Sequence, residues 1–173
     1  MSNWNLDNAH SEVQFKVRHM MVSNVSGYFR AFSGSMQAEK EDLSDAKFSF
    51  EAQIDSIDTR NSDRDNHLKS ADFFDAANHP ALSFHSNAVE ARGDQWIIKG
   101  DLSIRGTQLP VELQAEYNGQ AVDPYGQTKA GFEISGKISR KAYGLTWNAV
   151  TEAGSVVVSD EVKLLINAQF IKA

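Results

Sequence analysis

The most constraining feature of this sequence is an alternation of apolar and polar side chains with a period of two residues. Val13, Phe15 and Val17 alternate with polar neighbours, and the same pattern returns as far as the last segment, which runs from Val162 to Phe170. Successive side chains of a β-strand point to opposite faces, so this period predicts strands with one buried face. The chain is therefore predicted to be all-β.

The alternation recurs in eight segments, most of them separated by turn residues such as Gly93 and Gly119. In the fourth segment, Leu82, Phe84 and Ala88 are expected to share the inward face, whereas the inward face of the second segment is ambiguous. The predicted strands cover residues 13–18, 28–38, 47–54, 82–88, 96–105, 111–117, 132–138 and 162–170. One domain spanning residues 1–173 accommodates them all.

Residues 62–78 interrupt the alternation and carry helix signals. Ser62 or Asp63 is suited to cap a helix start, and Asp65 and Lys69 stand at the spacing of an i,i+4 ion pair. The segment ends just before a proline. We expect one short helix after the third strand, lying against the sheet or covering an opening.

About eight antiparallel strands form either a sandwich or a closed barrel, and periodicity alone does not separate the two. Small residues interrupt the otherwise bulky inward rows at Ala52, Gly100, Ala115, Gly136 and Ala168. They are consistent with an apolar internal tunnel and equally with tapering in a packed core. Both interpretations stay open at this point.

Composition excludes several functional classes. The net charge of −6 argues against a nucleic-acid-binding surface, and the absence of cysteine excludes thiolate metal sites and a cysteine nucleophile. The five histidines lack metal-binding spacing, so neither a metal nor a cofactor is expected. No apolar run approaches the roughly 18 residues of a membrane span. The start of the sequence lacks a leader pattern, which favours the cytoplasm as given, or the periplasm if a leader was removed.

Polar residues concentrate in residues 7–11, 56–68 and 123–126. They serve either as caps and turns or as a polar rim at a cavity mouth. In the second interpretation Arg64 is suited to a phosphate or carboxylate head group, because its guanidinium presents a fixed fork of donors.

The order of short motifs along the chain resembles the YceI-like family. The resemblance covers essentially the whole chain. It rests on Trp4, Asp7, His10-Ser11, Phe15, Arg18-His19, Gly27-Tyr28-Phe29, Phe32, Gly34, Ser56-Ile57-Asp58-Thr59, Arg64-Asp65, His67-Leu68, Ser70-Ala71-Asp72-Phe73-Phe74-Asp75, His79-Pro80, Gly100-Asp101-Leu102-Ser103-Ile104-Arg105-Gly106, Pro110-Val111, Asp123-Pro124-Tyr125-Gly126, Ala130-Gly131-Phe132, Arg140, Tyr143-Gly144-Leu145 and Asp160-Glu161-Val162. Tyr125 stands where the family commonly has tryptophan, and the leader of exported members is missing.

The resemblance implies an eight-stranded, lipocalin-like antiparallel barrel with an apolar cavity. It implies non-catalytic binding, transport or storage of a long-chain amphiphile: a polyisoprenoid, an isoprenoid quinone or a fatty-acid amide. A homodimer is also among the family's states. His10, Arg64 and His67 are the expected head-group contacts. The expected tail contacts are Phe15, Val17, Phe48, Phe50, Phe84, Leu102, Ile104, Phe132, Ile134 and Leu164.

Two other functions stay open. The first is an enzyme, such as a lipid isomerase or cyclase, that uses a buried Asp–His pair beside the cavity. The second is a haem-type binding protein. It would need an inward histidine, and His19 is the only strand histidine with the parity of Val13 and Val17.

Overall fold

The computed structural model describes residues 1–148 and 158–173. Its strands form a single antiparallel sheet. They are β1 (Ser2–Leu6), β2 (Glu12–His19), β3 (Ser23–Phe29), β4 (Phe32–Ala38), β5 (Lys47–Gln53), β6 (Ile57–Asp58), β7 (Ala81–Arg92), β8 (Gln95–Ile104), β9 (Thr107–Val122), β10 (Thr128–Ser139) and β11 (Val158–Lys172). One α-helix, α1 (Ser62–Lys69), and three 3-10 turns, η1 (Asn8–His10), η2 (Ile54–Ser56) and η3 (Lys141–Tyr143), complete the elements.

The eleven strands make eight continuous strands of the sheet, because β1 continues into β2, β3 into β4 and β5 into β6. We call each of these eight a stave. The stave made of β1 and β2 lies beside the stave made of β3 and β4, with β1 paired to β4 and β2 paired to β3. The long strand β11 pairs with β2 over most of its length and with β1 at its end. That last pairing joins the first and last staves, so the sheet is a closed barrel and the sandwich is excluded.

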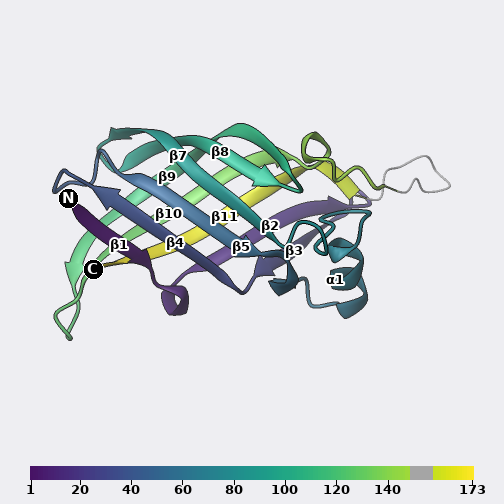
Figure 1. Ribbon diagram of the computed structural model, residues 1–173, viewed down its shortest axis with the longest axis horizontal. Coiled ribbons are helices and arrows are strands. Elements are labelled where there is room, and N and C mark those ends of the chain that lie inside the picture. Colours follow the sequence, from purple (N-terminus) through teal and green to yellow (C-terminus); the bar gives the residue numbers. More distant parts are fainter. Residues whose placement is uncertain (149–157) are drawn as a thin grey trace.

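The barrel is elongated and its two ends differ (Figure 1). The chain termini lie at one end, where the amide of Ala173 donates to the carbonyl of Asn3 at 2.8 Å, and α1 lies at the other. The prediction of an all-β, eight-stranded barrel with one short helix after the third strand is confirmed.

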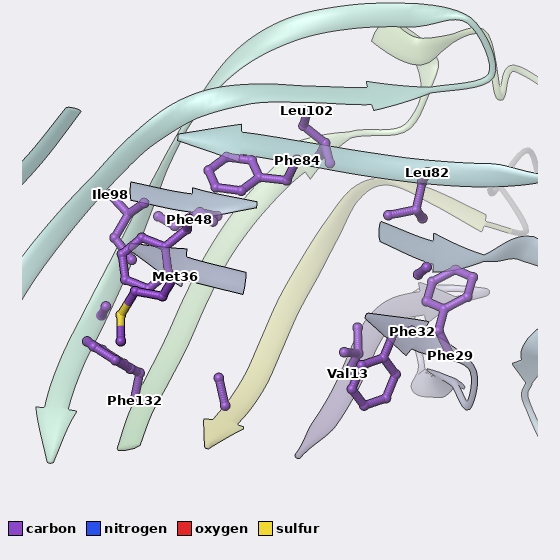
Figure 2. Close-up of a cluster of buried hydrophobic side chains, with 14 of the residues drawn as sticks. Val13, Phe29, Phe32, Met36, Phe48, Leu82, Phe84, Ile98, Leu102 and Phe132 are labelled. Carbon is purple, nitrogen blue, oxygen red and sulfur yellow. The ribbon is translucent and has the colours of Figure 1, made fainter. Parts of the chain in front are cut away.

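An aromatic cluster fills the barrel near the termini. The ring centroid of Phe132 lies 5.5 Å from Phe48, 5.2 Å from Trp96 and 5.1 Å from Tyr117. Phe170 completes the group at 6.0 Å from Phe132. We call these five residues the end plug. Figure 2 shows Phe48 and Phe132 gathered with Met36 and Ile98, apart from Val13 and Phe29 farther along the barrel.

The first half of the barrel contains two features that the alternation did not reveal. Strand β1 was not predicted, although its Trp4 is 1% exposed. The predicted strand over residues 28–38 is broken between β3 and β4, so that Phe29 and Phe32 both point inward three residues apart. This change of parity explains why its inward face was ambiguous.

The prediction that Ala88 points inward is wrong. The register between β7 and β8 shifts between Ser86 and Ala88, which is the signature of a β-bulge. The extra residue moves Ala88 to the exposed face and turns Val89 toward the core.

The helix is shorter than predicted and is capped differently. It ends at Lys69, where the hydroxyl of Ser70 donates to the carbonyl of His67. Its cap is Asn61, whose side chain accepts from the Arg64 amide, rather than Ser62 or Asp63. Asp65 does not pair with Lys69. It accepts hydrogen bonds from the amide and the hydroxyl of Thr59, and so ties the helix to the preceding strand.

Substituting Gly100 by alanine should destabilise the barrel. An added Cβ would lie 2.3 Å from the carbonyl oxygen of His85 and 2.6 Å from the Phe84 ring, so backbone must move. We expect a loss of about 1–3 kcal/mol in the free energy of unfolding, measured by urea denaturation. Gly131→Ala is the control, because its Cβ would meet Asn118 at an ordinary 3.6 Å. Equal stabilities of the two variants would contradict the close approach at Gly100.

Candidate ligand-binding site

The centre of the barrel holds an apolar cavity with a volume of about 120 Å³. Most of its lining residues belong to the inward faces of the strands, and the two with polar side chains, Gln14 and Ser49, stand at outward positions between inward residues. Eight of the ten predicted tail contacts line it: Phe15, Phe48, Phe50, Phe84, Leu102, Ile104, Ile134 and Leu164. The alternation therefore located most of this wall.

The small inward residues contribute less to the hollow than the pattern indicated. Of the five, only Ala168 lines the central cavity. The space at Gly100 is filled by the ring of Phe84, and the space at Gly136 by the side chain of Leu113. These glycines admit crossing side chains, as in a packed core.

Two further cavities continue from the centre toward α1. The first has a volume of about 90 Å³ and the second, at the mouth of the barrel, about 200 Å³. Phe15 lines all three cavities, and Val17 lines the two nearer α1. Phe132, the remaining predicted tail contact, lies in the end plug. The cavities thus form a row that is closed by the plug and ends at the mouth.

Arg64 and Thr59 provide the most ordered polar contact at the mouth. The Nε of Arg64 donates to the Thr59 hydroxyl at 2.8 Å, and its Nη2 donates to the Thr59 carbonyl at 2.6 Å. Thr59 is buried, and Asp65 accepts from its hydroxyl at 2.6 Å. The Nη1 of Arg64 makes no hydrogen bond within the described residues, so it remains a donor for a ligand.

His67 lies beside Arg64 in the same mouth cavity. Its Nε2 is 2.9 Å from a carboxylate oxygen of Asp72, and its ring packs edge-on against Phe73 and Trp147. His19 also lines this cavity, from the end of β2. The structure therefore brings together two of the three predicted head-group residues.

His10, the third predicted head-group residue, lies elsewhere. It belongs to η1, is exposed, and is not among the residues that line the three cavities. Its Nδ1 is 2.8 Å from an oxygen of Asp7. Burial alone would raise the pKa of Asp7, but the hydrogen bond and charge of His10 outweigh it and lower that pKa.

Sequence reasoning assigned no role to Arg140, which is 5% exposed at the α1 end. Its guanidinium donates to the carbonyls of Leu145 and Trp147 on one side of the mouth. It also donates to the carbonyls of Ser159 and Val158 on the other. A single buried cation thereby joins two segments of the mouth. Its targets are main-chain oxygens, which leave no pattern in the side-chain sequence.

Asp160 supports the same region from the start of β11. Burial alone would raise its pKa, but hydrogen bonds from the Lys141 amide and the Ser139 hydroxyl, with the charges of Lys141 and Arg140, lower it below the ordinary 3.8. Its carboxylate is therefore the form that the fold favours.

The family assignment follows from comparison with known proteins. The profile of the YceI-like domain matches residues 4–170. The chain belongs to the YceI-like domain family. A UPF0312 protein of Staphylococcus epidermidis is 36% identical over 171 residues, which cover 98% of each chain.

Solved structures share the fold of this chain. Burkholderia cenocepacia BcnA superimposes with a TM-score of 0.82 at 21% identity, covering 95% of this chain and 98% of BcnA. A polyisoprenoid binding domain from Saccharophagus degradans superimposes with a TM-score of 0.73 at 14% identity, covering 98% of both chains. At these identities the likeness establishes the fold. In the part of the chain that the structure describes, no helix is long and apolar enough to cross a membrane.

Replacing Asp160 by asparagine should destabilise the protein at pH 7 by about 1–3 kcal/mol, because donors that now meet a carboxylate would lose a charged partner. The folded-state pKa lies below the unfolded value. The stabilisation is therefore present above about pH 4 and is lost as the pH falls through the folded pKa. Urea denaturation between pH 7 and pH 3 should show the two proteins converging. Glu161→Gln, on an exposed neighbour, is the control, and a difference independent of pH would contradict this role.

Proposed function

We propose that this protein binds, carries or stores a long-chain amphiphile in the barrel without transforming it. The ligand is a polyisoprenoid, an isoprenoid quinone or a fatty-acid amide, with its apolar chain in the row of cavities and its head group at the α1 end. The carrying observation is the row itself: its walls are mostly apolar, and side chains with polar groups gather toward α1, with Arg140 and Tyr143 at the second cavity and Arg64 and His67 at the mouth.

The hydrophobic effect supplies the affinity in this proposal. Burying one CH₂ group gains about 0.8 kcal/mol, so a long chain gains enough over its length to bind tightly without a specific polar contact. The present cavities are small for such a chain. To admit a long chain the walls must widen by rotamer changes, and we propose that the rings of Phe15 and Phe50, which line the central cavity, move aside.

The comparisons support the same ligand class. The Saccharophagus degradans domain with this fold is a polyisoprenoid binding domain by its own description. This chain shares the fold, and its inward residues supply the apolar walls that such a ligand requires. Transfer of that ligand class to this chain is our proposal.

Catalysis receives no comparable support. The predicted enzyme would use a buried Asp–His pair beside the cavity. Of the two Asp–His pairs in the described residues, the His10 side chain is 61% exposed, and the Asp72 side chain that contacts His67 is 52% exposed. Neither pair is therefore buried beside the cavity as the predicted enzyme would require.

Filling the central cavity should abolish binding. Ile134→Trp places a large ring in the cavity, whereas Glu133→Trp places the same ring on the outer face of β10. We expect mass spectrometry of solvent extracts to find an amphiphile with the native protein and with Glu133→Trp, but not with Ile134→Trp. Thermal unfolding checks that both variants fold. Native protein that carries no amphiphile and shows no saturable binding of an isoprenoid quinone would refute the proposed function.

Arg64 should contribute to binding only when the ligand carries an anionic head group. Arg64→Gln should weaken binding of geranylgeranyl diphosphate about tenfold, because one charge-assisted contact is lost, and leave geranylgeraniol nearly unchanged. Arg64→Lys should restore part of the loss, and His10→Ala should affect neither ligand. Fluorescence titration measures the affinity of each of the four proteins for both ligands. Equal effects of Arg64→Gln on both ligands would show that Arg64 only shapes the mouth.

A further inference from the structure

The wall of the barrel is split between β9 and β10. The ladder that joins these strands runs from Thr128 paired with Val122 to Ser135 paired with Gln114, and stops there. Beyond this point residues 107–113 of β9 pair only with β8, and residues 136–139 of β10 pair only with β11. Along this stretch no hydrogen-bonded ladder holds the two described strands together.

A groove with a volume of about 810 Å³ occupies the split. A groove on the outside of an intact sheet would touch only outward side chains, because alternate residues face the interior. This groove is lined by outward Glu112 and Lys137 and also by inward Val111 and Ile138. It therefore extends into the thickness of the wall.

The groove is separated from the interior by single side chains. Val111, Ile138 and Leu164 line both the groove and the central cavity. Tyr143, from η3, lines both the groove and the adjoining cavity of the row. Rotation of these side chains would connect the groove to the cavities, with no backbone hydrogen bond broken. Along the part of β9 and β10 that is paired, from Thr128 to Ser135 on β10, an opening would require the two strands to separate.

Two residues indicate that the split is built into the sequence. Pro110 lies on the free side of β9, and a proline at a strand edge prevents pairing because it lacks an amide hydrogen. The hydroxyl of Tyr143 has no hydrogen-bond partner within the described residues, although the side chain is 98% buried, being 2% exposed. Buried hydroxyls normally have partners, so an unpaired one at this position is available to a passing polar group.

We propose that the split between β9 and β10 is a lateral entrance, through which the apolar chain of an amphiphile passes into the barrel. The inference rests on the proposed function, since it assigns a route to the ligand proposed above. The inward residues Val111, Ile138 and Leu164 form its gate. Tyr143 and the lysines that line the groove, Lys137 and Lys163, interact with the polar end of the ligand as it passes.

A single-cysteine experiment tests this route, because the native chain has no cysteine. Ala142 is exposed and lines the groove but none of the three cavities. Ala142→Cys, folded first and then labelled with N-cyclohexylmaleimide, blocks the groove after the barrel has formed. Stopped-flow fluorescence with 11-(dansylamino)undecanoic acid then gives the association and dissociation rate constants. We expect the label to slow both by about fivefold or more and to leave Kd within about twofold.

Two matched positions complete the test. Ala121→Cys carries the same label on β9 where β9 and β10 are paired, and should leave both rates unchanged. Arg18→Cys places it at the mouth cavity. If the label at Arg18→Cys slows both rates and the label at Ala142→Cys does not, the ligand enters through the mouth and the proposed lateral entrance is wrong.

A label at Ala142→Cys that raises Kd by accelerating dissociation alone would make the groove a binding surface, which also overturns the proposal. Unlabelled protein that binds no probe would refute the proposed function itself.

Discussion

The rest of this structure depends on backbone hydrogen bonding around a closed ring of strands. The two edge strands of an open sheet would leave unpaired amides and carbonyls, which water or another chain must satisfy. Here the pairing of β11 with β1 and β2 closes the ring, and most inward side chains are apolar. The interruption between β9 and β10 coincides with Pro110 and with the hydroxyl of Tyr143, which has no hydrogen-bond partner among the residues that the structure describes.

The two ends of the barrel have different chemistry, and the difference gives the cavity its direction. Rings at the end plug contact one another at centroid distances of 5–6 Å and leave little free space. At the mouth, Arg140 and Asp160 hold main-chain segments in place through hydrogen bonds. Arg64 and His67 line the mouth cavity. An amphiphile has the same asymmetry, so the barrel fits it in one orientation.

Much of the fold could be predicted from the sequence because burial on one face of a strand imposes a period of two. Most cavity walls followed from the same period, as with Phe84 and Leu102. What the period could not predict were features set by backbone geometry: the bulge that turns Ala88 outward, the break between Phe29 and Phe32, and the short strand around Trp4. The hollow itself arises from packing between staves. Of the two interpretations that stayed open for Gly100 and Gly136, the packed core applies, because neighbouring side chains fill those positions.

The candidate mouth was harder to predict, since proximity between distant loops has no local signature. Arg64 and His67 are near in sequence and meet as expected, whereas His10 lies in another part of the barrel. Arg140 binds carbonyl oxygens, and these are common to all residues. Its role became visible only once residues 145–147 and 158–159 were placed around it.

The contact between Asn3 and Ala173 has a consequence for how the protein is made. Strand β11 follows the other described strands in the sequence, yet it is the neighbour of β10, β2 and β1. The ring therefore cannot close before residues 158–172 are available to pair. The cavity is complete only once β11 has joined its three neighbours, so any lipid the protein carries is enclosed at or after that step.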